Sequence, residues 1–306
     1  MTQFAVDKAT FRGPSAVNIQ LTGGNLPTNA EVTDDESGSL YAETQSLTYF
    51  GPTMNGTSKA IGALLNICPQ NGQCIGAAEQ ITHADIFERN LKTCQSSESH
   101  LQHTCQKGLM RLQTLSAPRR SDATLSFLVD ALADGANAPI AVATGVSLPT
   151  VIVQRYRLGV CKIAGVTFTE IADVSIEFNV GITEKDPQLA EIFPQTVGVI
   201  TVRPVLVLRG QDLSQFRTTL IELGANAATH ANTLFQLRKL QDSGSYVDAA
   251  TAEHIAITMA GLAVPDSLAS GSGSSRATNE LRLPTRYDGV NTPLLINTSA
   301  TYNASP

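Results

Sequence analysis

Four side chains that could bind a transition metal lie within a dozen residues of one another: Cys94, His100, His103 and Cys105. Two thiolates and two imidazoles are ligands that a structural zinc ion takes in tetrahedral geometry. The spacing, Cys-x5-His-x2-His-x-Cys, does not match the usual zinc patterns. The sequence therefore favours a polar loop with scattered cysteines and histidines, and we expect no bound metal and no cofactor.

Two further cysteines, Cys68 and Cys74, flank a Pro-Gln-Asn-Gly turn that a disulfide could close in an oxidising setting. The chain has five cysteines, and an odd number fits a reducing compartment better than a full disulfide framework. The sequence leaves open whether Cys68, Cys74, Cys94 and Cys105 form disulfides.

Other catalytic arrangements are missing from the sequence. It contains neither a Gly-x-Ser-x-Gly elbow nor a glycine-rich phosphate-binding loop. His230 and His254 stand alone, which favours histidines whose hydrogen bonds the fold satisfies. Glu170 and Glu177 are interpreted as solvent-facing charges, because a glycosidase needs two carboxylates in a facing geometry. We predict that the chain is not an enzyme.

The charge content limits the possible partners. The 306 residues carry a net charge of −6, with 16% charged and 42% hydrophobic residues. A duplex-binding protein needs a concentrated basic face, whereas an acidic wall repels phosphate and suits a passage through which nucleic acid slides. A charge content below the usual quarter leaves two interpretations open: burial of surface between subunits, or a Ser/Thr/Asn-rich surface on an ordinary soluble protein.

Targeting signals are also missing from the sequence. The start lacks a basic region followed by an apolar run, and no apolar stretch approaches the roughly 20 residues of a membrane helix. We expect synthesis in the cytoplasm and no membrane insertion.

The clearest structural pattern is the alternation of apolar and polar residues from Val174 to Ile182. A period of two is the signature of a half-buried antiparallel strand. We expect one parity to face a core: Val174, Ile176, Phe178, Val180 and Ile182. We expect the other parity to face solvent or the lumen of an assembly: Ser175, Glu177 and Asn179.

Similar runs occur along most of the chain. Strands are predicted at 40–50, 110–115, 123–129, 150–160, 163–171, 197–208, 254–261, 277–284 and 293–301, while 213–223 and 232–240 fit a helix or a strand. Residues 151–182 are the best candidates for a shared inner sheet, and Pro204 predicts a bulge or an edge. The predicted fold class is mainly β: an antiparallel β-sandwich or partial barrel with an inserted irregular or helical segment and extended terminal arms.

Two segments depart from this pattern. Residues 1–40 are interpreted as an extended N-terminal arm that either orders on a neighbouring subunit or is disordered. The remainder, 41–306, is predicted to be a β-rich assembly domain with an inserted subdomain at about 55–107, which starts like a helix at 58–65 and lies outside the β core. The candidate assembly residues of the arm are Ala16, Val17, Ile19 and Leu21.

Three features of the C-terminal third combine into one further pattern: the strand 252–262, the Ser/Gly loop 269–275 and the ending 281–296. The ending contains Tyr-Asp-Gly-x-Asn-x-Pro-Leu at 287–294. This combination resembles phage tail tube proteins and related virion subunits, whose closing hairpin is similar.

The resemblance implies a β-sandwich subunit that forms hexameric rings, which stack into a tube around a DNA passage without binding DNA specifically. It also implies location in the virion, with the chain itself and other virion proteins as partners. The chain is long for a small tail tube subunit, and residues 55–107 depart from that plan. The alternatives are another virion component (a capsid, connector or baseplate protein) and a host-binding β domain. The latter wants exposed aromatic side chains, and only 5% of the residues are aromatic.

Overall fold

The chain is mainly β-structure with antiparallel sheets, as its computed structural model shows, so the predicted fold class is confirmed. The helix that the structure describes is α1 (Ile61–Ile67). The described residues are 4–11, 17–35, 44–67, 78–81, 87–93, 100–135, 137–163, 166–187, 192–211, 230–261, 264–270, 278–287 and 293–303.

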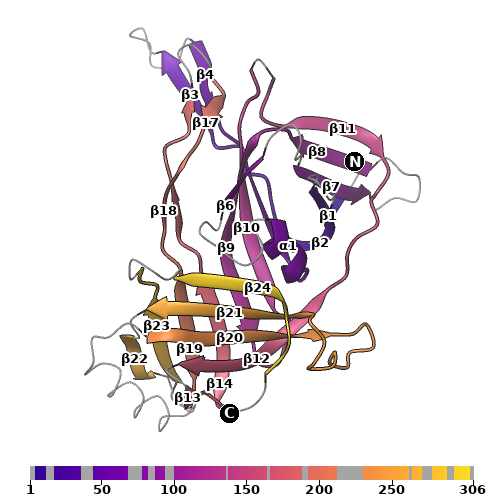
Figure 1. The fold of residues 1–306 in the computed structure, drawn as a ribbon. Helices are drawn as coiled ribbons and strands as arrows, with labels where there is room; N and C mark the ends of the chain where they lie inside the picture. Colours follow the sequence, from indigo (N-terminus) through magenta and orange to yellow (C-terminus); the bar gives the residue numbers. More distant parts are fainter. Residues whose placement is uncertain are drawn as a thin grey trace.

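The larger sheet has 13 strands and curls along its length (Figure 1). In spatial order its strands are β11 (Ala141–Val146), β8 (His100–Cys105), β7 (Phe87–Thr93), β1 (Phe4–Phe11), β2 (Val17–Gly23), β5 (Thr53–Ser58), β10 (Thr124–Ala131), β9 (Gly108–Pro118), β14 (Ile171–Glu177), β19 (Val205–Gly210), β23 (Thr278–Pro284) and β22 (Val264–Ser270). A short strand, β6 (Ala78–Ile81), adds to β9.

The smaller sheet has five strands, in the order β13 (Val166–Thr167), β12 (Arg155–Ile163), β20 (His230–Leu240), β21 (His254–Gly261) and β24 (Leu294–Ala300). Three two-stranded ribbons complete the described structure: β15 (Val180–Ile182) with β18 (Val199–Val202), β16 (Asp186–Pro187) with β17 (Pro194–Thr196), and β3 (Ala30–Asp35) with β4 (Thr44–Phe50). We call these pairs the projecting ribbons, because they extend from the body at the upper left of Figure 1.

The two sheets pack as layers of a sandwich. In Figure 1 the strands of the smaller sheet run across the lower part of the larger sheet, and α1 is drawn to the right of β9 and β10. One apolar cluster contains fully buried side chains from both layers, among them Phe127 on β10 and Phe178 directly after β14, together with Phe235 and Ile257 of the smaller sheet. Each such side chain stabilises the fold by roughly 1.5–3 kcal/mol relative to exposure.

Two of the described strands within residues 1–40, β1 and β2, are not part of an arm. β1 pairs with β2 and β7, and β2 also pairs with β5, so both strands lie inside the larger sheet. Ile19 has no exposed surface, Leu21 is 3% exposed and Val17 is half-buried. The predicted placement of Val17, Ile19 and Leu21 in a separate arm is therefore wrong, because they belong to the chain's own sheet and core. Ala16 lies outside the described residues.

Substitution at Ile19 tests this placement. We expect Ile19→Val to lower the free energy of unfolding by about 0.5–1.5 kcal/mol, since a methyl group is removed from a closed core position. The matched control is Gln20→Thr at the exposed neighbouring position, where we expect a change within about 0.5 kcal/mol. Urea denaturation followed by circular dichroism gives both values. Equal midpoints for Ile19→Val and the wild type would support an unpacked arm.

The described parts of residues 55–107 do not form an inserted subdomain outside the core. They supply most of β5, together with β7 and β8, to the larger sheet, and β6 to β9. The helix predicted to start near residue 58 is present as α1, and its Ile61, Leu64 and Leu65 are buried in the core. On β8, His100, His103 and Cys105 interrupt the apolar alternation, yet the strand pairs with β7 and β11, which is why the sequence pattern did not predict it.

Residues 151–182 do not share one inner sheet. β12 belongs to the smaller sheet and β14 to the larger one, and the predicted strand 163–171 shrinks to β13. The predicted strand from Val174 to Ile182 breaks at Asn179, whose φ of 47° lies in the left-handed region. Beyond this break the chain leaves the larger sheet, and β15 pairs with β18. Buried residues on the apolar parity are Val174, Ile176, Phe178 and Val180, with Ile182 partly buried.

The predicted strand 197–208 is also divided, at Pro204. Before the proline, β18 is exposed at Val199 and Ile200 and half-buried in its other two residues. After the proline, β19 is a central strand with Leu206, Val207 and Leu208 buried. The chain has neither the predicted bulge nor an edge strand at Pro204 but a break between β18 and β19, and burial on both faces holds for β19 alone.

β23 and β24 do not form a closing hairpin. β23 pairs with β19 and β22 in the larger sheet, whereas β24 pairs with β21 in the smaller one. The turn at 288–292 lies outside the described residues. The chain therefore passes from one layer of the sandwich to the other between β23 and β24.

Candidate functional site

One row of side chains across the larger sheet is mostly polar. Thr124, Ser116 and Ser175 lie side by side on β10, β9 and β14. The same row continues with Val207 on β19 and Arg282 on β23. Small hydroxyl side chains on β10, β9 and β14 thus lie beside charged side chains that extend to β23.

The three residues predicted to face solvent or a lumen differ in their exposure. Ser175 is only 8% exposed, so its predicted exposure is wrong. Its short side chain lies on a central strand, and Arg282 reaches across the neighbouring strand β19 to Glu177. The side chain of Glu177 is 34% exposed, and Asn179 is exposed but lies beyond the end of β14.

Five charged side chains on β14, β19 and β23 form a continuous chain of ion pairs. Arg282 Nη2 donates to Glu177 Oε2 at 2.7 Å, and its Nη1 donates to Glu280 Oε1 at 3.4 Å. Arg209 Nε donates to Glu280 Oε2 at 2.8 Å, and its Nη1 donates to Asp173 Oδ1 at 3.4 Å. The bond to Glu280 raises the pKa of Arg209. Three carboxylates thus engage both guanidinium groups and leave a net negative charge.

Reversing the charge at Glu177 should spare folding. We expect Glu177→Lys to change the free energy of unfolding by at most about 1 kcal/mol, because its partner Arg282 is partly exposed and such pairs contribute little. Glu177→Gln, which removes the charge alone, is the matched control. Chemical denaturation of the two variants measures the difference. A loss of several kcal/mol in Glu177→Lys would contradict the placement of this side chain at the surface.

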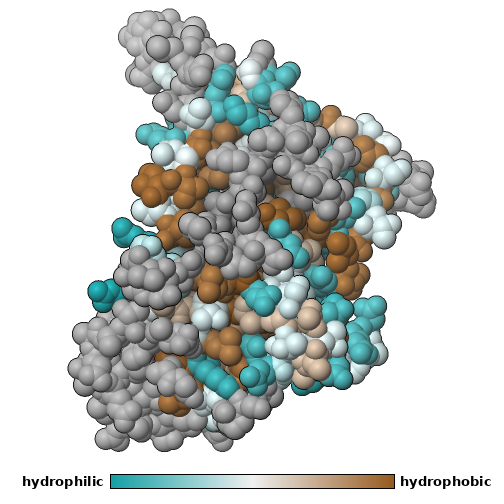
Figure 2. Space-filling model, viewed as in Figure 1, coloured by the Kyte–Doolittle hydropathy of each residue, from teal (hydrophilic) through white to brown (hydrophobic). Residues whose placement is uncertain are grey.

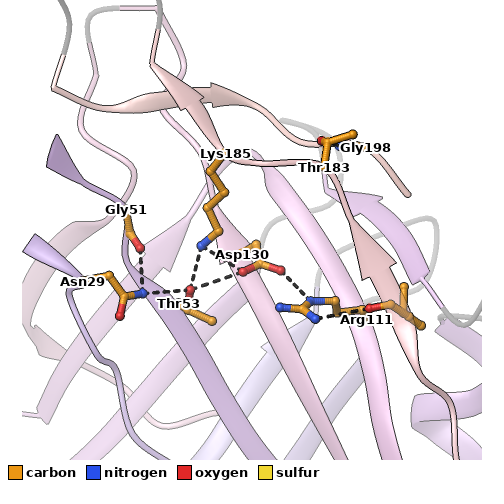
Figure 3. Close-up of polar contacts among 9 residues, drawn as sticks. Asn29, Gly51, Thr53, Arg111, Asp130, Thr183, Lys185 and Gly198 are labelled. Atoms are coloured by element: carbon orange, nitrogen blue, oxygen red, sulfur yellow. Dashed lines mark hydrogen bonds and ion pairs between the residues drawn. The ribbon is translucent and has the colours of Figure 1, made fainter. Parts of the chain in front are cut away.

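A second polar cluster lies where the projecting ribbons leave the body (Figure 3). Its centre is Asp130 on β10, which is 1% exposed. Arg111 Nε donates to Asp130 Oδ2 at 2.7 Å, and Lys185 Nζ lies 2.8 Å from Oδ1. Thr53 Oγ1 donates to the same carboxylate at 3.2 Å and accepts a hydrogen bond from Lys185 Nζ at 2.7 Å. The buried carboxylate is thus compensated by two cations and a hydroxyl group.

This cluster joins the ribbons to the larger sheet. Lys185 follows β15, and Arg111 Nη1 also donates to the carbonyl oxygen of Val180 at 3.4 Å. Asn29, just before β3, donates to Thr53 Oγ1 at 3.3 Å. Burial alone would raise the pKa of Asp130, but hydrogen bonds from Arg111 and Lys185 outweigh it and lower that pKa. Sequence reasoning missed the cluster; its one signal is a carboxylate inside the apolar run 127–133.

The projecting ribbons expose apolar side chains. Val32 and Leu47 pair directly across β3 and β4 and are 57% and 41% exposed. On β18, Val199 and Ile200 are 42% and 63% exposed. Figure 2 shows apolar side chains on the left flank, where β18 runs in Figure 1. Solvent-exposed apolar pairs on a thin ribbon gain no core packing, so they favour contact with another surface.

The cysteine and histidine residues are only partly described, since Cys68, Cys74 and Cys94 lie outside the described residues. His103 is paired with Arg89 across β7 and β8, and burial together with the charge of Arg89 lowers the pKa of His103. Burial raises the pKa of Cys105 to about 12, so its thiol is held protonated. Within the described part of the chain, no three His, Cys, Asp or Glu side chains are grouped to hold a metal ion.

His254 has satisfied hydrogen bonds, as the sequence predicted. It is buried in β21, and its Nδ1 accepts a hydrogen bond from the backbone N–H of Lys239 at 3.0 Å. Its Nε2 lies 2.9 Å from the carbonyl oxygen of Asp248. His230 lies at the start of β20.

Comparisons with known proteins add no relative. No protein-family model matches the chain, and no curated protein matches it. Among the described residues, no helix is long and apolar enough to cross a membrane.

Proposed function

We propose that this chain is a structural subunit of a virus particle, the phage tail tube, which self-assembles into stacked rings around a passage for DNA. The observation that carries the proposal is the set of exposed apolar residues on the projecting ribbons, Val32, Leu47, Val199 and Ile200. A monomer leaves these side chains in water, whereas a neighbouring copy would bury them.

The chain of ion pairs on β14, β19 and β23 supports the proposal of a passage for DNA. Both guanidinium groups, of Arg209 and Arg282, are engaged by carboxylates of the same sheet. A phosphate sliding past would have to displace those carboxylates to gain a contact. Together with the net charge of −6, this pairing favours a surface that does not retain nucleic acid.

Self-assembly is the first test of the proposal. Purified chain should form rings or tubes in negative-stain electron microscopy, and light scattering should report a mass that rises with protein concentration. The double variant Val32→Ser and Leu47→Ser should assemble more weakly at unchanged fold, because it removes an exposed apolar pair. Val207→Ser, which alters a buried residue, is the control that shows how loss of core packing affects assembly. A monomer at every concentration and salt would contradict the proposal.

Nucleic acid retention is the second test. The wild type, once assembled, should show no salt-dependent retention of duplex DNA. Assemblies of Glu177→Lys should retain it at low salt, because Nη2 of Arg282 loses its carboxylate and the new lysine adds a second group that can bind phosphate. Equal retention of DNA by wild type and Glu177→Lys would show that the ion pairs on β14, β19 and β23 do not line the passage. It would not contradict self-assembly.

A further inference from the structure

The larger sheet has one guarded edge and one unguarded edge among the described strands. At one end, β22 contains Pro265 and Asp266, and its pairing with β23 shifts register twice. Prolines, charges and bulges are the devices that keep an edge strand from pairing with another chain. At the other end, β11 has no proline and no charge, and its single register shift, at Gly145, lies near its end.

The smaller sheet shows the same asymmetry. Its edge strand β13 has only two residues, which is too short to template another strand. The opposite edge, β24, has seven residues without a charge and pairs with β21 alone among the described strands. Thr298, near its end, donates to Asn66 of α1, while Leu295 (37% exposed) and Asn297 are exposed earlier in the strand.

The two unguarded edges both lie in long uncharged regions of the chain. Residues 135–154, which contain β11, and residues 289–306, which contain β24, hold no Asp, Glu, Lys, Arg or His. Val142 and Val153 in the first region are 63% and 62% exposed. Figure 2 shows apolar side chains along the right flank, where the chain descends from β11 in Figure 1.

We infer that β11 of one copy pairs with β24 of the next copy. This inference rests on the proposed self-assembly and names the strands that perform it. The two strands have six and seven residues, and neither brings a charge that pairing would have to desolvate. The two strands lie on different surfaces of the subunit, so the contact is heterologous. Each copy uses its β11 edge toward one neighbour and its β24 edge toward the other. Repetition of such a contact closes a ring or extends a filament.

Crosslinking between two separate variants tests the pairing. Ala143→Cys on β11 and Leu295→Cys on β24 are purified separately, mixed, assembled and treated with a short bis-maleimide. The mixture should give a crosslinked dimer that neither variant gives alone. Wild type treated in parallel reports any product of its own five cysteines. A dimer from Ala143→Cys alone would show that β11 pairs with β11 of its neighbour, and the inference would be overturned.

Placing a charge on the edge strand β11 gives a second test of the pairing. Val142→Lys should fold normally, because the side chain is exposed, and should raise the concentration needed for assembly by at least about tenfold, since pairing would bury the ammonium group. Asp266→Lys on the guarded edge is the control and should assemble like wild type. If wild type assembles while the mixture gives no crosslink and Val142→Lys is unaffected, the pairing is wrong and the proposed function stands. If wild type never assembles, both are wrong.

Discussion

Replacing Phe178 with aspartate is expected to leave the subunit unfolded. Phe178 has no exposed surface and belongs to the apolar cluster that both layers of the sandwich share. Truncation of a buried phenylalanine costs about 3–5 kcal/mol, and a buried carboxylate without a partner adds several more. The sum approaches or exceeds the roughly 5–15 kcal/mol that holds a typical domain together. Far-UV circular dichroism and soluble yield report the loss directly.

The neighbouring residue supplies a matched control for this substitution. Asn179 is exposed, and its positive φ is one that aspartate tolerates, so Asn179→Asp places the same carboxylate one position away at small cost. We expect it to fold, with at most about 1 kcal/mol lost because its Nδ2 no longer donates to the carbonyl oxygen of Arg203. If Phe178→Asp folded and Asn179→Asp did not, the side chain of residue 179 and not that of Phe178 would face the core.

Alternation predicted which side chains are buried far better than it predicted which strands are neighbours. The buried parity through Val174, Ile176 and Phe178 follows directly from a period of two. The same pattern does not name a pairing partner, so β12 and β14 were expected in one sheet and lie in two. The short apolar run around Ile19 shows the same limit of sequence patterns. Its sequence predicts a strand but does not tell whether the strand pairs within its own chain or with a neighbouring subunit.

The candidate site was less predictable because its contacts join distant parts of the chain. Glu177 was recognised as a surface charge, but its partner Arg282 is 105 residues away. Thr53 and Lys185, which meet at Asp130, are separated by 132 residues. No local spacing encodes such contacts, since they depend on how the sheets and ribbons are arranged. The break at Asn179, which sends β15 away from the sheet, is likewise set by the surrounding structure.

Removing the charge of Asp130 is expected to destabilise the fold strongly. In Asp130→Asn the guanidinium of Arg111 and the ammonium group of Lys185 lose the carboxylate that compensates them, and the side chain of Lys185 is only 12% exposed. Breaking a buried ion pair by removing one partner costs about 3–5 kcal/mol. Asp173→Asn is the matched control, because its carboxylate is 30% exposed beside Arg209 and should cost at most about 1 kcal/mol. Urea denaturation of the two variants should separate them clearly.

The pH dependence of stability identifies the cause of that loss. The pKa of Asp130 is lower in the fold than its ordinary value of 3.8, so the unfolded chain binds this proton more tightly. The stabilisation is therefore fully present above about pH 5 and is lost as the pH falls through the unfolded and then the folded pKa. The difference in unfolding free energy between wild type and Asp130→Asn should be constant from about pH 5 to 8 and shrink below about pH 4.

A double-mutant cycle with Lys185 then tests whether this carboxylate holds the ribbon to the sheet. Lys185→Met removes the ribbon's cation and leaves Arg111 to compensate Asp130, so we expect a smaller loss than in Asp130→Asn. Once Asp130 is absent, Lys185→Met should cost much less or restore stability, because it removes an uncompensated buried charge. Additive effects of the two substitutions would mean that the ribbon is held by other contacts, and the role assigned to Asp130 would be wrong.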